Sequence, residues 1–148
     1  MQSAAVFELK DRLLVHPWQR TTTGLLVASE PYISLPLGAD PKTLGDSVLT
    51  VLNASGRTVP HPKSWKDVAA ARLEAAGVKS ERAFQLGARC LNVEREARAL
   101  RIEPSCNGGA AGDSKGFELL PQVSESLPLH ATADEMAAAI HAGFERCR

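Results

Sequence analysis

Apolar residues recur at every fourth position in two separate stretches of the chain. One stretch follows the tetrapeptide Ser-Leu-Pro-Leu at 34–37, and the other follows the same tetrapeptide at 126–129. Laid on each other without a gap, the two stretches align three pairs of apolar residues: Leu44 with Met136, Val48 with Ile140, and Leu52 with Phe144. A spacing of four indicates one apolar stripe of an amphipathic helix. We therefore predict a duplicated strand-turn-helix unit.

Both predicted helices have start signals at aligned positions. Asp40 is a good N-cap residue and precedes Pro41, whose fixed φ suits the first helical position. Thr132 has Glu135 three residues later, which is the spacing of a capping box. The preceding segments, YISLPL and SESLPL, read as short strands. Each contains a proline, which cannot donate to a sheet ladder and so favours a sheet edge or a strand end.

The segment between the two units predicts further helices and a hairpin. Ser64 with Asp67 forms a start signal, Gly77 is a natural stop, and Ser80 opens a shorter helix that ends near Gly87. Residues 90–104, CLNVEREARALRIEP, alternate apolar and polar positions on both sides of a charged turn, which indicates a hairpin. The order of strands, helices, strands and helix predicts an α+β fold, with a mixed or antiparallel sheet and about four helices packed against it.

Length and composition limit the class of protein. A chain of 148 residues with 44% apolar residues suits one globular domain over 1–148, although residues 1–19 carry no assignment. Lysine plus arginine equals aspartate plus glutamate at 17 each, so no overall basic field draws the chain to nucleic acid or anionic lipid. No apolar run approaches the roughly 18 residues that a membrane span needs. We expect a soluble, cytoplasmic protein with no direct contact to nucleic acid or membrane.

The residue types that carry chemistry form no recognisable motif. Cys90, Cys106 and Cys147 are odd in number and widely spaced, which favours reduced thiols over a disulfide framework or a zinc site. The glycine-rich stretch 107–116 lacks the phosphate-loop pattern and reads as a surface loop. No two histidines stand at a metal-binding spacing. We expect no catalytic residue, no cofactor and no metal. The histidines are His16, His61, His130 and His141.

Two catalytic arrangements stay open from residue types alone. Cys90 with a histidine would make a thiol nucleophile pair, and the glutamates at 94, 96 and 103 lie near the predicted hairpin, which would bring two carboxylates together, but residue types alone show neither adjacency. Glutamate alternates with arginine in this segment, however, and that pattern favours a solvated hairpin face with cross-strand ion pairs. Trp18 and Trp65 are expected in the core or partly buried.

The ordered segments of the chain together resemble the immunity proteins of contact-dependent growth inhibition systems, the CdiI family. The resemblance runs from about Arg20 to Cys147 and consists of small and apolar positions without a catalytic motif. The segments that carry it are TTTGLLVASEPYISLPLG, LGDSVLTVLNAS, GVKSERAF, CLNV, RIEPS, GFELL and ADEMAAAIHAGFERC. The stretches NGGAAGDSKG and VPHPKSW are of a kind that varies freely, so the resemblance does not extend to toxin specificity.

The resemblance implies a cytoplasmic protein that binds the C-terminal toxin domain of a cognate CdiA effector and protects the cell that makes it. Such toxins are commonly nucleases. A stoichiometric inhibitor is not an enzyme, which agrees with the lack of a catalytic motif. Two alternatives stay open: a small soluble enzyme, which needs a pocket with a convergent nucleophile and base, and a general adaptor with no toxin partner.

The chain becomes acidic toward its end. From residue 106 onward the basic residues are Lys115, Arg146 and Arg148, and the acidic ones are Asp113, Glu118, Glu125, Asp134, Glu135 and Glu145. A nuclease presents a positive surface to its substrate, and a complementary acidic patch on an inhibitor increases association rate and specificity. We predict that Asp113, Glu118 and Glu125 face the toxin. Asp134 and Glu135 are second choices, because acids in a first helical turn also complement the helix dipole.

Overall fold

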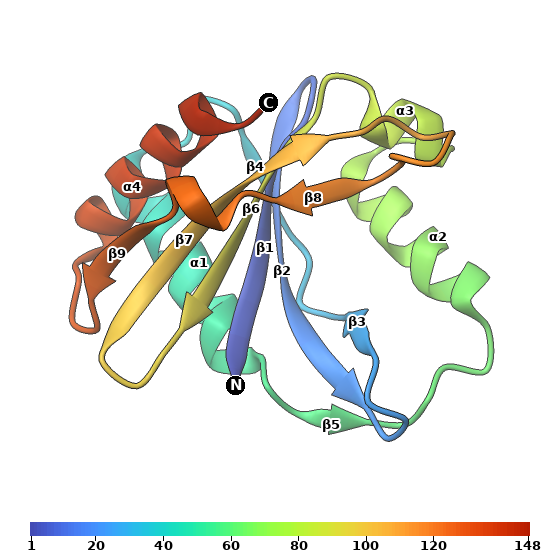
Figure 1. Ribbon diagram of the computed structural model, residues 1–148, viewed down its shortest axis with the longest axis horizontal. Coiled ribbons are helices and arrows are strands. Elements are labelled where there is room, and N and C mark those ends of the chain that lie inside the picture. The colour runs from blue at the N-terminus through green and yellow to red at the C-terminus, as the bar shows by residue number, and fades with distance from the viewer.

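The computed structural model describes residues 1–148, which fold into a sheet of short and long strands with four α-helices. Figure 1 shows the arrangement. The strands are β1 (Gln2–Glu8), β2 (Arg12–Thr21), β3 (Leu26–Ala28), β4 (Ile33–Pro36), β5 (Thr58–Val59), β6 (Arg89–Arg95), β7 (Ala99–Asn107), β8 (Phe117–Leu119) and β9 (Glu125–Pro128). The helices are α1 (Pro41–Ala54), α2 (Trp65–Ala76), α3 (Glu81–Gln85) and α4 (Ala133–Arg146), with a 3-10 turn at Pro121–Val123.

The central sheet runs in the order β4-β2-β1-β6-β7-β9, and each neighbouring pair is antiparallel. The strands β3 and β8 extend the far ends of β2 and β7, while the two-residue β5 pairs with β2 in parallel. The sheet is therefore mixed, and the four helices pack against it. This confirms the predicted α+β class, and residues 90–104 form the predicted hairpin between β6 and β7.

The two Ser-Leu-Pro-Leu segments lie at opposite edges of this sheet in matching register. Leu35 of β4 pairs with Leu13 of β2, and Leu127 of β9 pairs with Leu100 of β7. The repeat is larger than the predicted strand-turn-helix unit, because β1-β2-β3-β4-α1 and β6-β7-β8-β9-α4 follow the same path. The two copies meet where β1 pairs with β6. Residues 1–19, unassigned from sequence, thus supply β1 and most of β2.

The helices α1 and α4 lie side by side on one face of the sheet and close the larger core (Figure 1). The residues of the two predicted apolar stripes are all buried in this core, namely Leu44, Val48, Leu52, Met136, Ile140 and Phe144. Their burial confirms the alignment of the two helices. The helices are in close contact at Gly45, where an added Cβ would lie 2.0 Å from the carbonyl oxygen of Ala133. The glycine is therefore required by the crossing of the two helices.

The helix start signals act as predicted. The side chain of Asp40 accepts a hydrogen bond from the backbone N–H of Thr43 at 2.9 Å. Thr132 and Glu135 form a reciprocal capping box, with hydrogen bonds of 3.0 and 3.1 Å. Gly77 ends α2 with a φ of 73°, a left-handed conformation that glycine adopts at little cost. Local sequence therefore sets the ends of these helices.

Candidate functional site

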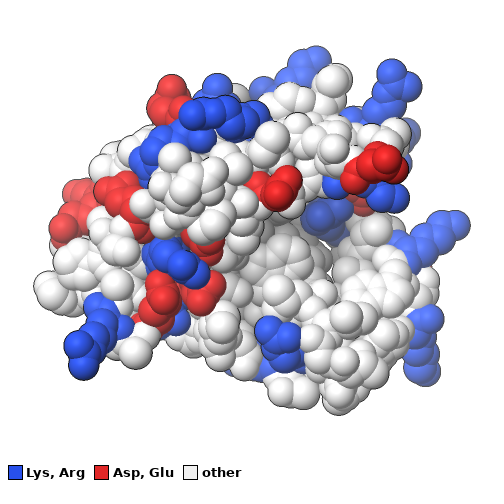
Figure 2. Space-filling view, viewed as in Figure 1, with Lys and Arg blue, Asp and Glu red and all other residues white.

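A groove of about 1070 Å³ lies on the face of the sheet opposite α1 and α4. Its floor is formed by β1 and β6, which contribute Ser3, Ala5 and Phe7 from one strand and Cys90 and Asn92 from the other. Figure 2, drawn from this side, shows the surface hollowed at this place. Large clefts of this kind are where proteins most often bind other molecules.

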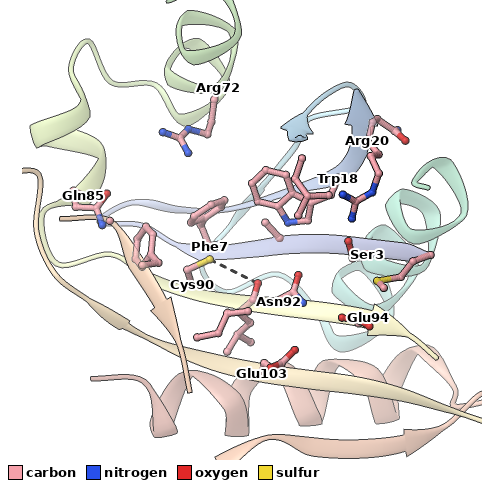
Figure 3. Close-up of a pocket in the computed structure, with 18 of the residues that line it drawn as sticks. Ser3, Phe7, Trp18, Arg20, Arg72, Gln85, Cys90, Asn92, Glu94 and Glu103 are labelled. Atoms are coloured by element: carbon pink, nitrogen blue, oxygen red, sulfur yellow. Dashed lines mark hydrogen bonds between the residues drawn. The ribbon is translucent and has the colours of Figure 1, made fainter. Parts of the chain in front are cut away.

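One wall of the groove comes from β2, β3 and α2 and is apolar with basic groups. Trp18 and Arg20 project from β2 toward the cavity, as Figure 3 shows, and Leu26 of β3 is 52% exposed at the rim. Arg72 of α2 donates two hydrogen bonds to the carboxylate of Glu81, at 2.9 and 2.8 Å, and lies 4.5 Å from the ring centre of Phe84. Arg72 is therefore neutralised and fastens α2 to α3.

The opposite wall comes from β6 and β7 and is acidic. Three carboxylates surround the single guanidinium of Arg101: Glu94 at 3.7 Å, Glu96 at 3.2 Å and Glu103 at 3.3 Å. Glu94 and Arg101 face each other directly across the β6–β7 register. Three negative charges against one positive charge leave this wall with an excess of negative charge. Figure 2 shows acidic side chains gathered over β6 and β7 beside the hollow.

The charged β6–β7 wall occupies the positions that are buried in the β1–β2 hairpin of the first half of the repeat. Phe7 pairs with Leu14 in the first hairpin, and Glu94 pairs with Arg101 in the second. Two residues further along each strand, on the same face of the sheet, Ala5 pairs with His16 and Asn92 pairs with Glu103. In the first half, α2 and α3 cover this face and form a second apolar cluster with Phe7 and Leu14. The corresponding positions of the second half are charged and border the open groove.

A network around Asn107 holds the far end of the groove. Its side-chain nitrogen donates to the carbonyls of Gln85 and Ala88, both at 2.7 Å. Its side-chain oxygen accepts from the backbone N–H of Gly109 at 2.8 Å and from the amide of Gln85 at 3.1 Å. Because these partners lie on α3, just before the start of β6 and in the glycine-rich loop, one side chain ties the loop to the body of the protein.

Two titratable groups beside the groove are held in their neutral forms. His16 is fully buried among Phe7, Trp18 and Tyr32, and burial lowers its pKa to about 4. Its Nδ1 hydrogen donates to the carbonyl of Pro17 at 3.0 Å, and Nε2 has no partner. Burial also raises the pKa of the Cys90 thiol far above its usual value. A neutral, buried thiol is a poor nucleophile.

The acidic residues predicted to face a partner do not form one cluster. Asp113 is exposed in the glycine-rich loop, and Glu118 is exposed on β8. Glu125 on β9 is half-buried and lies 3.5 Å from Arg146. Asp134 is exposed at the start of α4, and the Glu135 carboxylate there accepts a hydrogen bond from the Thr132 N–H. None of the five lines the groove. The acidic residues that line its β6–β7 wall are Glu94 and Glu103, which the sequence analysis assigned to a solvated hairpin face.

The two catalytic arrangements left open by the sequence do not assemble. Cys90 lies against Cys147, whose thiol donates to the carbonyl of Cys90 at 3.5 Å, and the glutamates around Arg101 are held in ion pairs. No group of three or more potential ligands stands close enough to hold a metal ion.

No helix is long and apolar enough to cross a membrane. Trp18 is half-buried, whereas Trp65 is 43% exposed and less covered than expected.

These features define an α+β protein built from two copies of one unit around an open groove. The sequence profile of the CdiI family, described as CDI immunity protein, matches residues 2–147. The chain therefore belongs to the CDI immunity protein family, as the resemblance in its sequence indicated. No curated protein sequence matches this chain significantly.

Two solved structures share the fold. The protein NMB0488 of Neisseria meningitidis, described as of unknown function, has a TM-score of 0.79 at 21% identity, covering 99% of this chain and 95% of its own. A CdiA-CT/CdiI toxin and immunity complex from Yersinia pseudotuberculosis contains a chain with a TM-score of 0.78 at 14% identity, covering 99% of this chain and 97% of its own. The common fold thus extends over the whole length.

Proposed function

We propose that this protein binds the C-terminal toxin domain of a cognate CdiA effector and neutralises it in the cytoplasm, protecting the bacterium that makes it. The observation that carries the proposal is the match of the immunity family to residues 2–147. The complex from Yersinia pseudotuberculosis, which pairs a toxin with an immunity protein of this fold, supports a toxin as the partner. The protein acts by occupying the toxin and catalyses no reaction.

The toxin we propose is a nuclease, because the exposed charge of the C-terminal half is suited to a basic surface. Asp113 and Glu118 are exposed and free of ion pairs, so they are available for complementary contacts that raise the association rate. Glu125 is a weaker candidate because it lies against Arg146. Asp134 and Glu135 remain second choices, since Glu135 is engaged in the capping box.

The experiment is co-expression of this protein with the toxin domain encoded beside its gene. We expect the toxin domain alone to arrest growth and degrade nucleic acid, and co-expression to restore both growth and intact nucleic acid. Toxicity that persists with the immunity protein present would overturn the proposed function. Growth arrest without degradation of RNA or DNA would leave neutralisation standing and exclude a nuclease.

A further inference from the structure

The groove carries a feature that ordinary packing of the fold does not require. In the first half of the repeat, α2 and α3 cover Phe7 and Leu14, which are buried. The equivalent positions in the second half are Glu94 and Arg101, and they line the open groove. The chain thus keeps one half of this face apolar where a helix pair covers it, and makes the other half charged where none does.

The charged half is more than a solvated surface, because one of its carboxylates is buried. Glu103 is only 5% exposed and lies on the groove lining, with the guanidinium of Arg101 as its ion-pair partner at 3.3 Å. Arg101 is shared with Glu94 and Glu96, so one cation serves three carboxylates. A buried carboxylate without full compensation costs free energy unless a further positive group reaches it.

The apolar parts of the groove fit a protein segment. Leu26 on β3 and Leu119 on β8 are 52% and 41% exposed, and both line the groove, from opposite halves of the repeat. Trp18 also lines the groove, with Arg20 beside it on β2 (Figure 3). Exposed leucines and a tryptophan around a cleft, with charged groups at its side, have the composition of an interface core and rim.

We propose that this groove is the toxin-binding surface, and that the toxin inserts a protruding segment whose arginine or lysine reaches Glu94 and Glu103. The inference rests on the proposed function and specifies its site. The charges of the two groove walls determine how the inserted toxin segment is oriented. Its basic side chain points to the β6–β7 wall, because the opposite wall carries Arg20, whose guanidinium is engaged only by the carbonyl of Gly24 at 2.7 Å. A guanidinium suits the site best, since it forms paired hydrogen bonds with carboxylates.

The test measures binding of the toxin domain encoded beside this gene to the full-length protein and its variants. Glu94→Lys places a positive charge in the groove, and Glu103→Gln removes a charge with little change of shape. The matched control is Asp46→Lys on α1, an exposed charge reversal on the opposite face of the sheet. We expect Kd to rise about 30-fold or more for each groove variant, and to change less than about threefold for the control.

The outcomes separate the inference from the proposed function. If the wild-type protein does not bind the toxin domain, both are overturned. If the wild type binds and the folded groove variants bind equally well, only the groove assignment is overturned, and Glu118→Lys then tests the exposed acidic residues instead. If Glu103→Gln fails to fold, Glu94→Lys decides the question, because Glu94 is only partly buried. Circular dichroism verifies that each variant is folded.

Discussion

His16 and Glu103 occupy equivalent positions in the two halves of the repeat, and both are almost completely buried. His16 pairs with Ala5, Glu103 pairs with Asn92, and Ala5 pairs with Asn92, so the four residues form one row across the sheet. At one end of the row, His16 is a neutral imidazole beneath α2. At the other end, Glu103 is a carboxylate beside Arg101. The same backbone thus supports an apolar core at one end and a charged groove wall at the other.

The buried imidazole makes stability depend on pH. The pKa of His16 is lowered to about 4 by burial, and Arg72 lowers it further, although the hydrogen bond to Pro17 opposes the shift. Below the unfolded pKa of roughly 6.5, the unfolded state takes up a proton that the folded state does not, so stability falls as pH falls toward 4. From pH 7.5 to pH 5 we expect a loss of about 2 kcal/mol. Urea unfolding of the wild type and of His16→Phe at both pH values measures this loss of stability. An equal loss in the variant would show that His16 is not its cause.

Gly45 tests the closeness of the two repeat helices. In an isolated helix, Gly→Ala stabilises by roughly 1 kcal/mol. Here the added methyl group would lie 2.0 Å from the backbone oxygen of Ala133, and backbone atoms cannot move aside cheaply. We expect Gly45→Ala to destabilise the protein by about 2 kcal/mol or more. Thermal unfolding measures the change, with exposed Gly38→Ala, which meets no atom within 4 Å, as the control.

Truncation of the aligned core residues should be costly in both halves. Leu52 of α1 and Ile140 of α4 are both fully buried. Replacing either by alanine is expected to lower the free energy of unfolding by about 2 to 5 kcal/mol, because each leaves a cavity in the larger core. Denaturant unfolding provides the measurement. A cost below about 1 kcal/mol in one helix only would show that the two helices do not contribute equivalently.

Asn107 is expected to control the order of the glycine-rich loop. Asn107→Asp retains the shape but replaces a nitrogen that donates to two carbonyls with an oxygen that cannot donate. We expect a loss of stability of about 2 kcal/mol. Faster amide hydrogen exchange at residues 108–116 is also expected, because Gly109 is held by the same side chain. Unchanged exchange in a destabilised variant would mean that the loop is ordered by other contacts.

The three thiols should differ in reactivity. Burial raises the pKa of Cys90, and the neighbouring Cys147 raises it further, so little thiolate forms near neutral pH. Cys106 and Cys147 are less buried. Brief treatment of the native protein with iodoacetamide, followed by mass spectrometry, should therefore modify Cys90 most slowly. Cys90 reacting first would reopen the thiol nucleophile considered from the sequence.

The sequence by itself determined the features that depend on neighbouring residues. The stripes from Leu44 to Leu52 and from Met136 to Phe144, the caps at Asp40 and Thr132, and the hairpin over 90–104 follow from periodicity and capping within about a dozen residues. The alignment of the two tetrapeptides also indicated the repeat. Its extension to β1–β3 and β6–β8 was not visible, because the paired strands share a path and a register but few residue types.

Only the tertiary structure decided what the second half of the sheet presents to a partner. The sequence assigned Glu94, Glu96 and Glu103 to a solvated face, and it predicted no secondary structure for residues 1–19. Pairing of β1 with β6 joins the two halves, and α2 with α3 then covers the first half while the groove stays open beside the second. This arrangement depends on contacts between residues far apart in the chain, and a local pattern of polar and apolar positions does not encode which distant segment covers which face.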